Sequence, residues 1–177
     1  VRRFLGVEMV KKGVDLRLNV NVSAIERTDG GLRVGLDDGS TVVVDAVLSA
    51  TGRVPNVAGL GFEAAGVAQA SDGAVVVDAH YRTSAPSVYA VGDVTARMQL
   101  TPVALGEAMV VADRLFGPPS GKAPRGMDYE FIPTAVFTHP TVGTVGMTEA
   151  EAREAFGAVA IYRSEFKALR HTLSGSS

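Results

Sequence analysis

Residues 14–22 alternate apolar and polar side chains, and this period of two predicts a β-strand with one buried face. Turn signals at 29–31 and 37–39 bracket residues 32–36, which predicts a second strand joined in a hairpin. Residues 41–50, TVVVDAVLSA, are almost continuously apolar, a pattern typical of a strand buried on both faces at the centre of a sheet. We therefore expect a small antiparallel meander that leads into a larger sheet.

Two segments carry strong helix signals. Residues 1–12 end in two lysines before Gly13, which is typical of a helix C-terminus. A longer helix is predicted from Thr101 as its N-cap, with Pro102 in the first turn and Gly117 beyond its end. Its apolar residues follow the i, i+3, i+4, i+7 rule and predict one buried face: Leu105, Ala108, Met109, Ala112, Leu115 and Phe116.

Shorter elements complete the prediction. A brief helix is expected around residues 60–65, closed by Gly66, and a capping box at Thr148–Glu151 opens a helix that runs to Phe156. Residue composition predicts strands within 75–77, 87–91, 131–145 and 161–166.

The chain contains no cysteine, which excludes disulfides, thiolate metal sites, iron–sulfur ligation and any dithiol redox centre within its 177 residues. Its three histidines do not have the spacing of a metal cluster, so no metal site is expected. A net charge of −2 offers polyanions no electrostatic attraction, so nucleic acid is not an expected partner. The longest apolar stretches are too short for a membrane span, and we expect no membrane association.

Residues 59–64 match the dinucleotide fingerprint GxGxxA, and Asp78 follows at about the spacing of the acid that binds a ribose. The first glycine of that fingerprint must end a strand so that the next helix can point at a pyrophosphate. Here residues 54–56, which include a proline, intervene after the predicted strand. A loop that uses its glycines for turns is therefore the preferred interpretation.

Gly92 and Asp93 are the better candidate for a binding site, because they end a predicted strand and precede the helix at Thr101. Ligands of α/β sheets bind outside the carboxyl ends of strands. A carboxylate there can accept from a sugar hydroxyl, and the helix start carries partial positive charge. The simpler alternative is an aspartate that only satisfies the amides of a turn.

Two histidines invite a catalytic interpretation that we do not prefer. His139 lies beside Pro140, and the nearest carboxylate in the sequence after it is Glu149, so a structural histidine next to a turn is favoured. His171 follows Arg170 in a polar run, where it could meet a charged ligand or form part of the solvated surface, and we favour the surface.

Four ordered motifs resemble the pyridine nucleotide-disulfide oxidoreductase family. They are residues 50–56 (ATGRVPN), 83–94 (TSAPSVYAVGDV), 100–104 (LTPVA), and 133–137 with 142–149 (PTAVF and VGTVGMTE). Within the family, LTPVA and the segment FKALRHTLSG at 166–175 are similar to bacterial and plant-type glutathione reductases. The resemblance implies FAD and NADPH as cofactors, glutathione disulfide as substrate, and a cytoplasmic homodimer formed through the C-terminal domain.

The resemblance also implies roles for the residues that match its motifs. Asp93 is expected to bind the ribityl chain of FAD, and Gly92 to allow that approach. The helix that begins at Leu100, Thr101 and Pro102 is expected to direct its amide dipole at the flavin pyrimidine edge.

Three further positions are carried over from the family. Gly52 and Arg53 are expected near the NADPH and the flavin, and Leu169 is expected to border the disulfide substrate of the partner subunit. No catalytic residue is expected in this chain, because the chemistry of the family needs a redox-active cysteine pair.

The family's FAD fingerprint, CxxxxC, NADPH-binding GxGxxG and carboxyl-terminal His-Pro-Thr followed by glutamates are not found in this sequence. The His-Pro-Thr at residues 139–141 lies instead in the motif that opens the interface domain, so it is not expected to take the catalytic role. We therefore expect an internal slice of a longer α/β enzyme, with α+β character at its C-terminal end and parts of three-layer nucleotide-binding domains. Residues 1–54 would complete the NADPH domain, 55–128 would form the returning segment of the FAD domain, and 129–177 would start the dimer-interface domain.

Alternatives to a glutathione reductase stay open. They are a dihydrolipoamide dehydrogenase, a trypanothione, mycothione or mercuric reductase, and an inactive truncated dimerisation module. The chain alone is expected to lack reductase activity, to bind FAD poorly, and to expose the apolar faces of residues 41–50 and 131–145.

Overall fold

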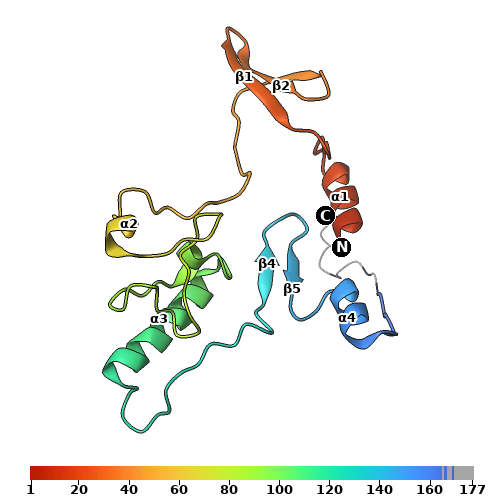
Figure 1. Ribbon diagram of the computed structural model, residues 1–177. Helices are drawn as coiled ribbons and strands as arrows, with labels where there is room; N and C mark the ends of the chain where they lie inside the picture. The colour runs from red at the N-terminus through yellow and green to blue at the C-terminus, as the bar shows by residue number, and fades with distance from the viewer. Residues whose placement is uncertain (165, 167–168, 170–177) are drawn as a thin grey trace. The chain divides into compact units, whose positions relative to one another are not determined.

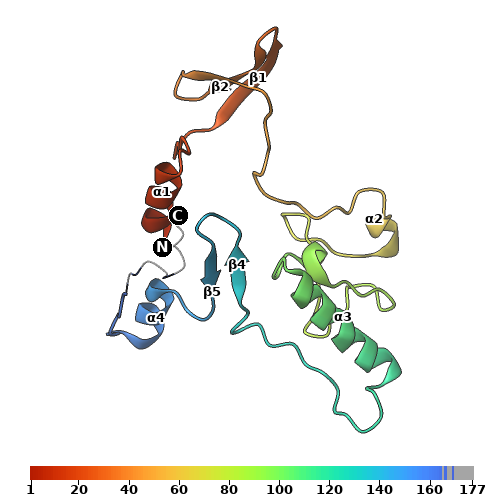
Figure 2. The same ribbon diagram turned by 180° about the vertical axis from the view of Figure 1, so that it is seen from behind.

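The computed structural model describes residues 1–164, 166 and 169 (Figures 1 and 2). They form two compact units. One unit is Val10–Asp128, and the other joins Val1–Met9 to the described residues from Tyr129 onward. Among the described residues, no helix is long and apolar enough to cross a membrane.

A three-stranded antiparallel sheet forms the meander near the start of the larger unit. It consists of β1 (Val22–Thr28), β2 (Gly31–Leu36) and β3 (Thr41–Val44), with β2 in the middle. Ile25 pairs with Val34, which in turn pairs with Val42 on the other side, so the buried Val34 lies at the centre of the sheet. The predicted meander, its two turns and the strand at 32–36 are confirmed.

The predictions for the flanking strands are wrong in their bounds. Residues 14–21 belong to no ladder in the described part of the chain, and the first strand begins only at Val22. The strand predicted over 41–50 ends at Val44, and Leu48 beyond it is 90% exposed. Alternation and apolarity make a segment fit for a sheet, but a strand also needs a neighbour to accept its backbone hydrogen bonds.

The first predicted helix is confirmed as α1 (Arg2–Lys11). Gly13, which has a φ of 88°, ends the helix, and its amide donates to the carbonyl of Val10 at 2.9 Å. The brief helix α2 (Phe62–Ala65) is confirmed as well, and Gly66 ends it in the left-handed conformation.

A small apolar core follows α2 and is built from Val67, Val75 and Ala85. The strands predicted at 75–77 and 87–91 are not formed, since each makes only one isolated bridge. The reason lies in the hydrogen bonds: Val75 donates to Val94, whereas the next residue, Val76, donates to Ala68. Successive amides thus bond to different segments, and no continuous ladder can develop.

The long helix α3 (Thr101–Phe116) is confirmed, but its buried face is not the predicted one. Its buried residues are Val103, Glu107 and Asp113. The predicted apolar stripe is largely exposed, and Phe116 reaches 86% exposure. Two carboxylates therefore occupy positions on the face that packs inside this unit.

The second unit contains a hairpin and a short helix. Strands β4 (Thr134–Val136) and β5 (Val142–Thr144) pair antiparallel, with Ala135 opposite Gly143, as the β-type composition of 131–145 predicts. Helix α4 (Glu149–Phe156) begins with the predicted capping box. Residues 161–164 form no strand, so that prediction is wrong where the structure describes it.

Candidate functional site

Gly92 and Asp93 begin η1, a single turn of 3-10 helix over Gly92–Thr95. Gly92 is buried and has a φ of 72°. A Cβ at this position would lie 2.9 Å from the Cβ of Ala104 in α3, closer than real side chains approach. Glycine is therefore required here both by the left-handed backbone and by the close packing of α3.

The turn is tied together by two short hydrogen bonds. The hydroxyl of Thr95 donates to the carbonyl of Gly92 at 2.8 Å, and the amide of Ala96 donates to the carbonyl of Asp93 at 3.1 Å. These bonds use backbone carbonyls and leave the Asp93 carboxylate on the outside of the turn. The Asp93 side chain is half exposed.

Asp93 and Arg53 lie beside each other in the lining of an open cleft of about 330 Å³. Arg53 Nη1 lies 3.9 Å from Asp93 Oδ2, and both side chains are well exposed, so the ion pair adds little stability. The cleft is lined by Arg53, Val54, Pro55, Asn56, Asp93, Val94 and Gln99. The fold thus brings together two residues that lie 40 positions apart in the sequence and that the motifs single out independently.

The start of α3 is built differently from the prediction. Leu100, whose φ and ψ are −134° and 131°, is the N-cap, and Thr101 is the first helical residue, without a side-chain cap hydrogen bond. The carbonyl of Leu100 accepts from the amides of Val103 and Ala104, each at 3.0 Å. Pro102 has no N–H, so the helix start offers the amide of Thr101 and its partial positive charge to a ligand.

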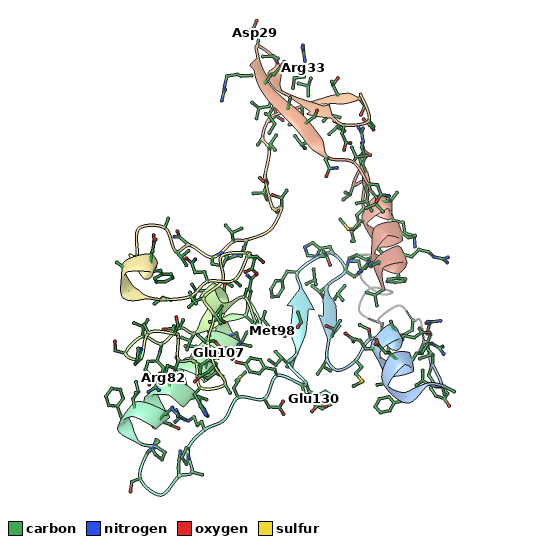
Figure 3. All side chains as sticks on the ribbon, viewed as in Figure 1. Asp29, Arg33, Arg82, Met98, Glu107 and Glu130 are labelled. Atoms are coloured by element: carbon green, nitrogen blue, oxygen red, sulfur yellow. The ribbon has the colours of Figure 1, made fainter. Side chains whose placement is uncertain are left out.

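Sequence reasoning missed Glu107, the largest fully buried side chain in the described chain together with Val103. Its side chain is labelled on α3 in Figure 3. Oε2 of Glu107 accepts from the backbone amide of Gly92 at 2.5 Å. The spacing of Val103 and Glu107, four residues apart, places both on one face of the helix, but it does not indicate the backbone amide that Glu107 binds.

A second buried carboxylate, Asp113, holds the segment that follows α3. Its Oδ2 accepts from the amide of Arg125 at 3.1 Å, and its Oδ1 lies 3.6 Å from the guanidinium of the same residue. A Cβ at Gly106, on the same helix, would meet the sulfur of Met127 at 2.9 Å. Residues 125–127 therefore run back along α3.

The rejected dinucleotide fingerprint begins in a loop at residues 59–61 and ends in the single turn of α2. Gly59 and Gly61 both have positive φ, and no strand of the described chain leads into them. Asp78 closes a turn instead: its Oδ1 accepts from the amides of His80 at 2.7 Å and Arg82 at 3.0 Å. The hydrogen bond from the Arg82 amide, followed by that from His80, lowers the pKa of this carboxyl.

The remaining candidates lie elsewhere. His139 is exposed in the turn between β4 and β5. Leu169 is exposed and belongs to the second unit. His171 lies outside the described residues. In the part of the chain that the structure describes, no group of three or more His, Asp or Glu side chains could hold a metal ion.

Family models match both parts of the chain. Residues 1–108 match the pyridine nucleotide-disulphide oxidoreductase model, and residues 132–177 match the dimerisation domain of the same family. The chain belongs to the pyridine nucleotide-disulphide oxidoreductase family.

Individual relatives give a finer comparison. A glutathione reductase of Burkholderia cepacia is 49% identical over 99% of this chain and 38% of its own length. A trypanothione reductase of Trypanosoma congolense is 42% identical over 99% of this chain and 35% of its own. RclA, an HOCl-induced flavoprotein disulfide reductase of Escherichia coli, superposes with a TM-score of 0.74 at 37% identity, covering 84% of this chain and 33% of that structure.

The chain thus spans a little more than a third of the length of these curated relatives. The match to the nucleotide-binding model and the dimerisation model supports the predicted combination of domain types. The described residues hold two small antiparallel sheets and helices rather than a complete three-layer domain.

Proposed function

We propose that this chain is part of an FAD-dependent oxidoreductase that reduces glutathione disulfide with NADPH. The observation that carries the proposal is the half-exposed carboxylate of Asp93, held outside a tied turn and beside Arg53 in a cleft whose other lining residues include Gln99. The identity of 49% with a glutathione reductase supports the substrate. A trypanothione reductase is the second candidate, since one is 42% identical over the same share of the chain.

The residues of the cleft fit a flavin nucleotide. Asp93 offers acceptor oxygens for the hydroxyls of a ribityl chain, and Arg53, Asn56 and Gln99 offer donors. Gln99 directly precedes Leu100, so the positively polarised start of α3 lies next to the same cleft. When bound, FAD supplies two-electron transfer between a pyridine nucleotide and a disulfide.

The contribution of this chain to that chemistry is binding and orientation. Asp93 and Arg53 hold the ligand, Gly92 lets α3 pack closely behind the turn, and Thr101 and Pro102 define the helix start. Gly52, which has a φ of 123°, allows the backbone bend directly before Arg53, and both residues lie near NADPH and the flavin in this proposal. The redox dithiol must come from outside these residues, because they contain no cysteine.

The proposal extends to the parts of the chain. Residues 1–54 belong to the NADPH domain, 55–128 to the FAD domain and 129–177 to an interface through which the cytoplasmic enzyme forms a homodimer. The match of residues 132–177 to a dimerisation domain supports the last assignment. Leu169 in that segment borders the disulfide substrate.

The test uses the complete protein that contains this chain. Its purified form is expected to carry FAD and to oxidise NADPH when glutathione disulfide is added, faster than with trypanothione disulfide. Asp93→Ala is expected to weaken FAD binding about tenfold, the order of a lost hydrogen bond to a charged group. The matched control is Asp29→Ala, an exposed aspartate at the β1–β2 turn (Figure 3).

Three results would contradict the proposal. They are a complete protein that holds no flavin, a complete protein that reduces none of the disulfides offered, and an Asp93→Ala variant that binds FAD as tightly as the control. A preference for trypanothione disulfide would replace glutathione with the second candidate and leave the class of reaction unchanged.

A further inference from the structure

Glu107 is an acidic residue at a buried position, where a hydrophobic side chain would carry a smaller desolvation penalty. It is 1% exposed and shares the inner face of α3 with Val103. Removing a carboxylate from water is costly unless hydrogen bonds compensate for the lost hydration. The position therefore needs an explanation beyond filling the space between α3 and the turn.

The contact of Glu107 supplies that explanation. Its Oε2 accepts from the amide of Gly92, the residue directly before Asp93. Ala104, one helical turn earlier, packs against the Cα side of the same glycine. Two positions one turn apart on α3 thus fix Gly92, Glu107 through a hydrogen bond to its amide and Ala104 through contact.

The backbone of Gly92 in turn controls the direction of Asp93. Its carbonyl is held from the other end of the turn by the hydroxyl of Thr95, at 2.8 Å. With both ends of the turn restrained, the carboxylate of Asp93 is left to face the cleft and Arg53. Loss of the Glu107 bond would free the Gly92 amide, and a glycine has more backbone freedom than any other residue to use that release.

We propose that Glu107 is a positioning residue, whose buried carboxylate orients the Gly92–Asp93 turn and thereby sets the affinity of the cleft for the flavin. The inference rests on the proposed function, because it assumes that Asp93 contacts FAD. Glu107 is buried and does not line the cleft, so its effect on the ligand would pass through the backbone of Gly92.

A close comparison is available within α3. Glu107 and Asp113 are both buried carboxylates, and each accepts from a backbone amide, but the amide held by Asp113 belongs to Arg125 and not to the turn. Replacement of either by leucine removes one buried acceptor. Only the Glu107 variant should loosen the turn that carries Asp93.

The experiment measures FAD dissociation constants of the complete protein, at a temperature where circular dichroism shows every variant folded. Glu107→Leu is expected to bind FAD up to about tenfold more weakly, no more than Asp93→Ala, because it acts through the orientation of that carboxylate. Glu107→Gln, which keeps an acceptor oxygen, is expected to stay within a few-fold of the unaltered protein. Asp113→Leu is expected to lower the unfolding temperature without changing FAD affinity.

Hydrogen exchange adds a readout that does not depend on flavin. In the apoprotein, amides of residues 91–96 should exchange faster in Glu107→Leu than in Asp113→Leu. If Glu107→Leu does not fold, Glu107→Met, which fills a similar space without an acceptor oxygen, takes its place and should also exchange faster at 91–96 than Asp113→Leu. Equal FAD affinity of the two leucine variants, or unchanged exchange at 91–96, would overturn the inference.

The two proposals can fail separately. If the unaltered complete protein binds no FAD, the proposed function is wrong, whereas the exchange measurement still tests the link between Glu107 and the turn. If the unaltered complete protein binds FAD and the Glu107→Leu variant binds FAD equally tightly, only the positioning role is wrong.

Discussion

Replacement of Gly92 by alanine tests the packing on which the candidate site depends. A non-glycine residue at a φ of 72° costs about 1–2 kcal/mol. The added Cβ would also lie 2.9 Å from the Cβ of Ala104, and relief of such an overlap costs about 1–3 kcal/mol. The two effects together predict that Gly92→Ala destabilises the packing of η1 on α3 by about 2–5 kcal/mol.

Gly66→Ala is the matched control. Gly66 has a nearly equal φ of 69°, but nothing lies within 4 Å of the Cβ it would acquire. It should therefore cost only about 1–2 kcal/mol, the conformational part. Native-state hydrogen exchange of the complete protein can measure both changes, from peptides that cover 92–116 and 62–70, without assuming a single unfolding transition.

The double variant Gly92→Ala with Ala104→Gly separates strain from overlap. Removal of the methyl group from residue 104 makes room for the new one, so the two substitutions should be less harmful together than the sum of each alone. Equal effects of Gly92→Ala and Gly66→Ala, or strict additivity in the double variant, would refute the close approach of α3 to the turn.

Three further predictions concern other parts of the chain. Thr148→Ala removes the N-cap of α4 and should speed amide exchange there about fivefold, whereas Glu154→Ala, outside the capping box, should not. Hydrogen bonds to Glu151 from the Thr148 amide, and to a lesser extent from its hydroxyl, lower the pKa of the Glu151 carboxyl. The carboxylate therefore stabilises α4 fully when the pH is above 4.5, the ordinary glutamate pKa. This stabilisation is lost as the pH falls through the lowered pKa. Exchange protection of α4, corrected for intrinsic rates, should therefore drop on acidification, and a Glu151→Gln variant that shows the same drop would refute this assignment. The chain of 177 residues by itself should show no disulfide reductase activity and should bind FAD poorly, and a stoichiometric yellow complex would contradict this.

Local signals in the sequence predicted local structure well. The capping box at Thr148, the glycines that end α1 and α2, and the turns of the meander all depend on residues within a few positions of one another. Such interactions form wherever the backbone allows them, whatever the rest of the protein does. The end of α3 before Gly117 was predictable for the same reason, whereas its N-cap is Leu100 and not the predicted Thr101.

The ion pair between Arg53 and Asp93 could be anticipated only through the family motifs. The local sequence around either residue does not indicate that the other lies nearby. Their proximity depends on the path of the chain between them, which includes the core of Val67, Val75 and Ala85. The roles of these residues in binding stay predictions. Glu107 was not predicted because its partner is a backbone amide, which no side-chain pattern reveals.

The misplaced strands and the inverted face of α3 have one physical origin. Leu48 and Phe116 are strongly exposed although the sequence around each has the apolar pattern of a buried element. A hydrophobic pattern indicates which face of a segment favours burial, but that face is buried only where a second surface packs against it. Glu107 and Asp113 behave differently, because their partners, the amides of Gly92 and Arg125, lie within the described chain. Polar contacts completed inside the chain thus determine which face of α3 is buried here, and the apolar stripe marks where further protein surface would have to pack.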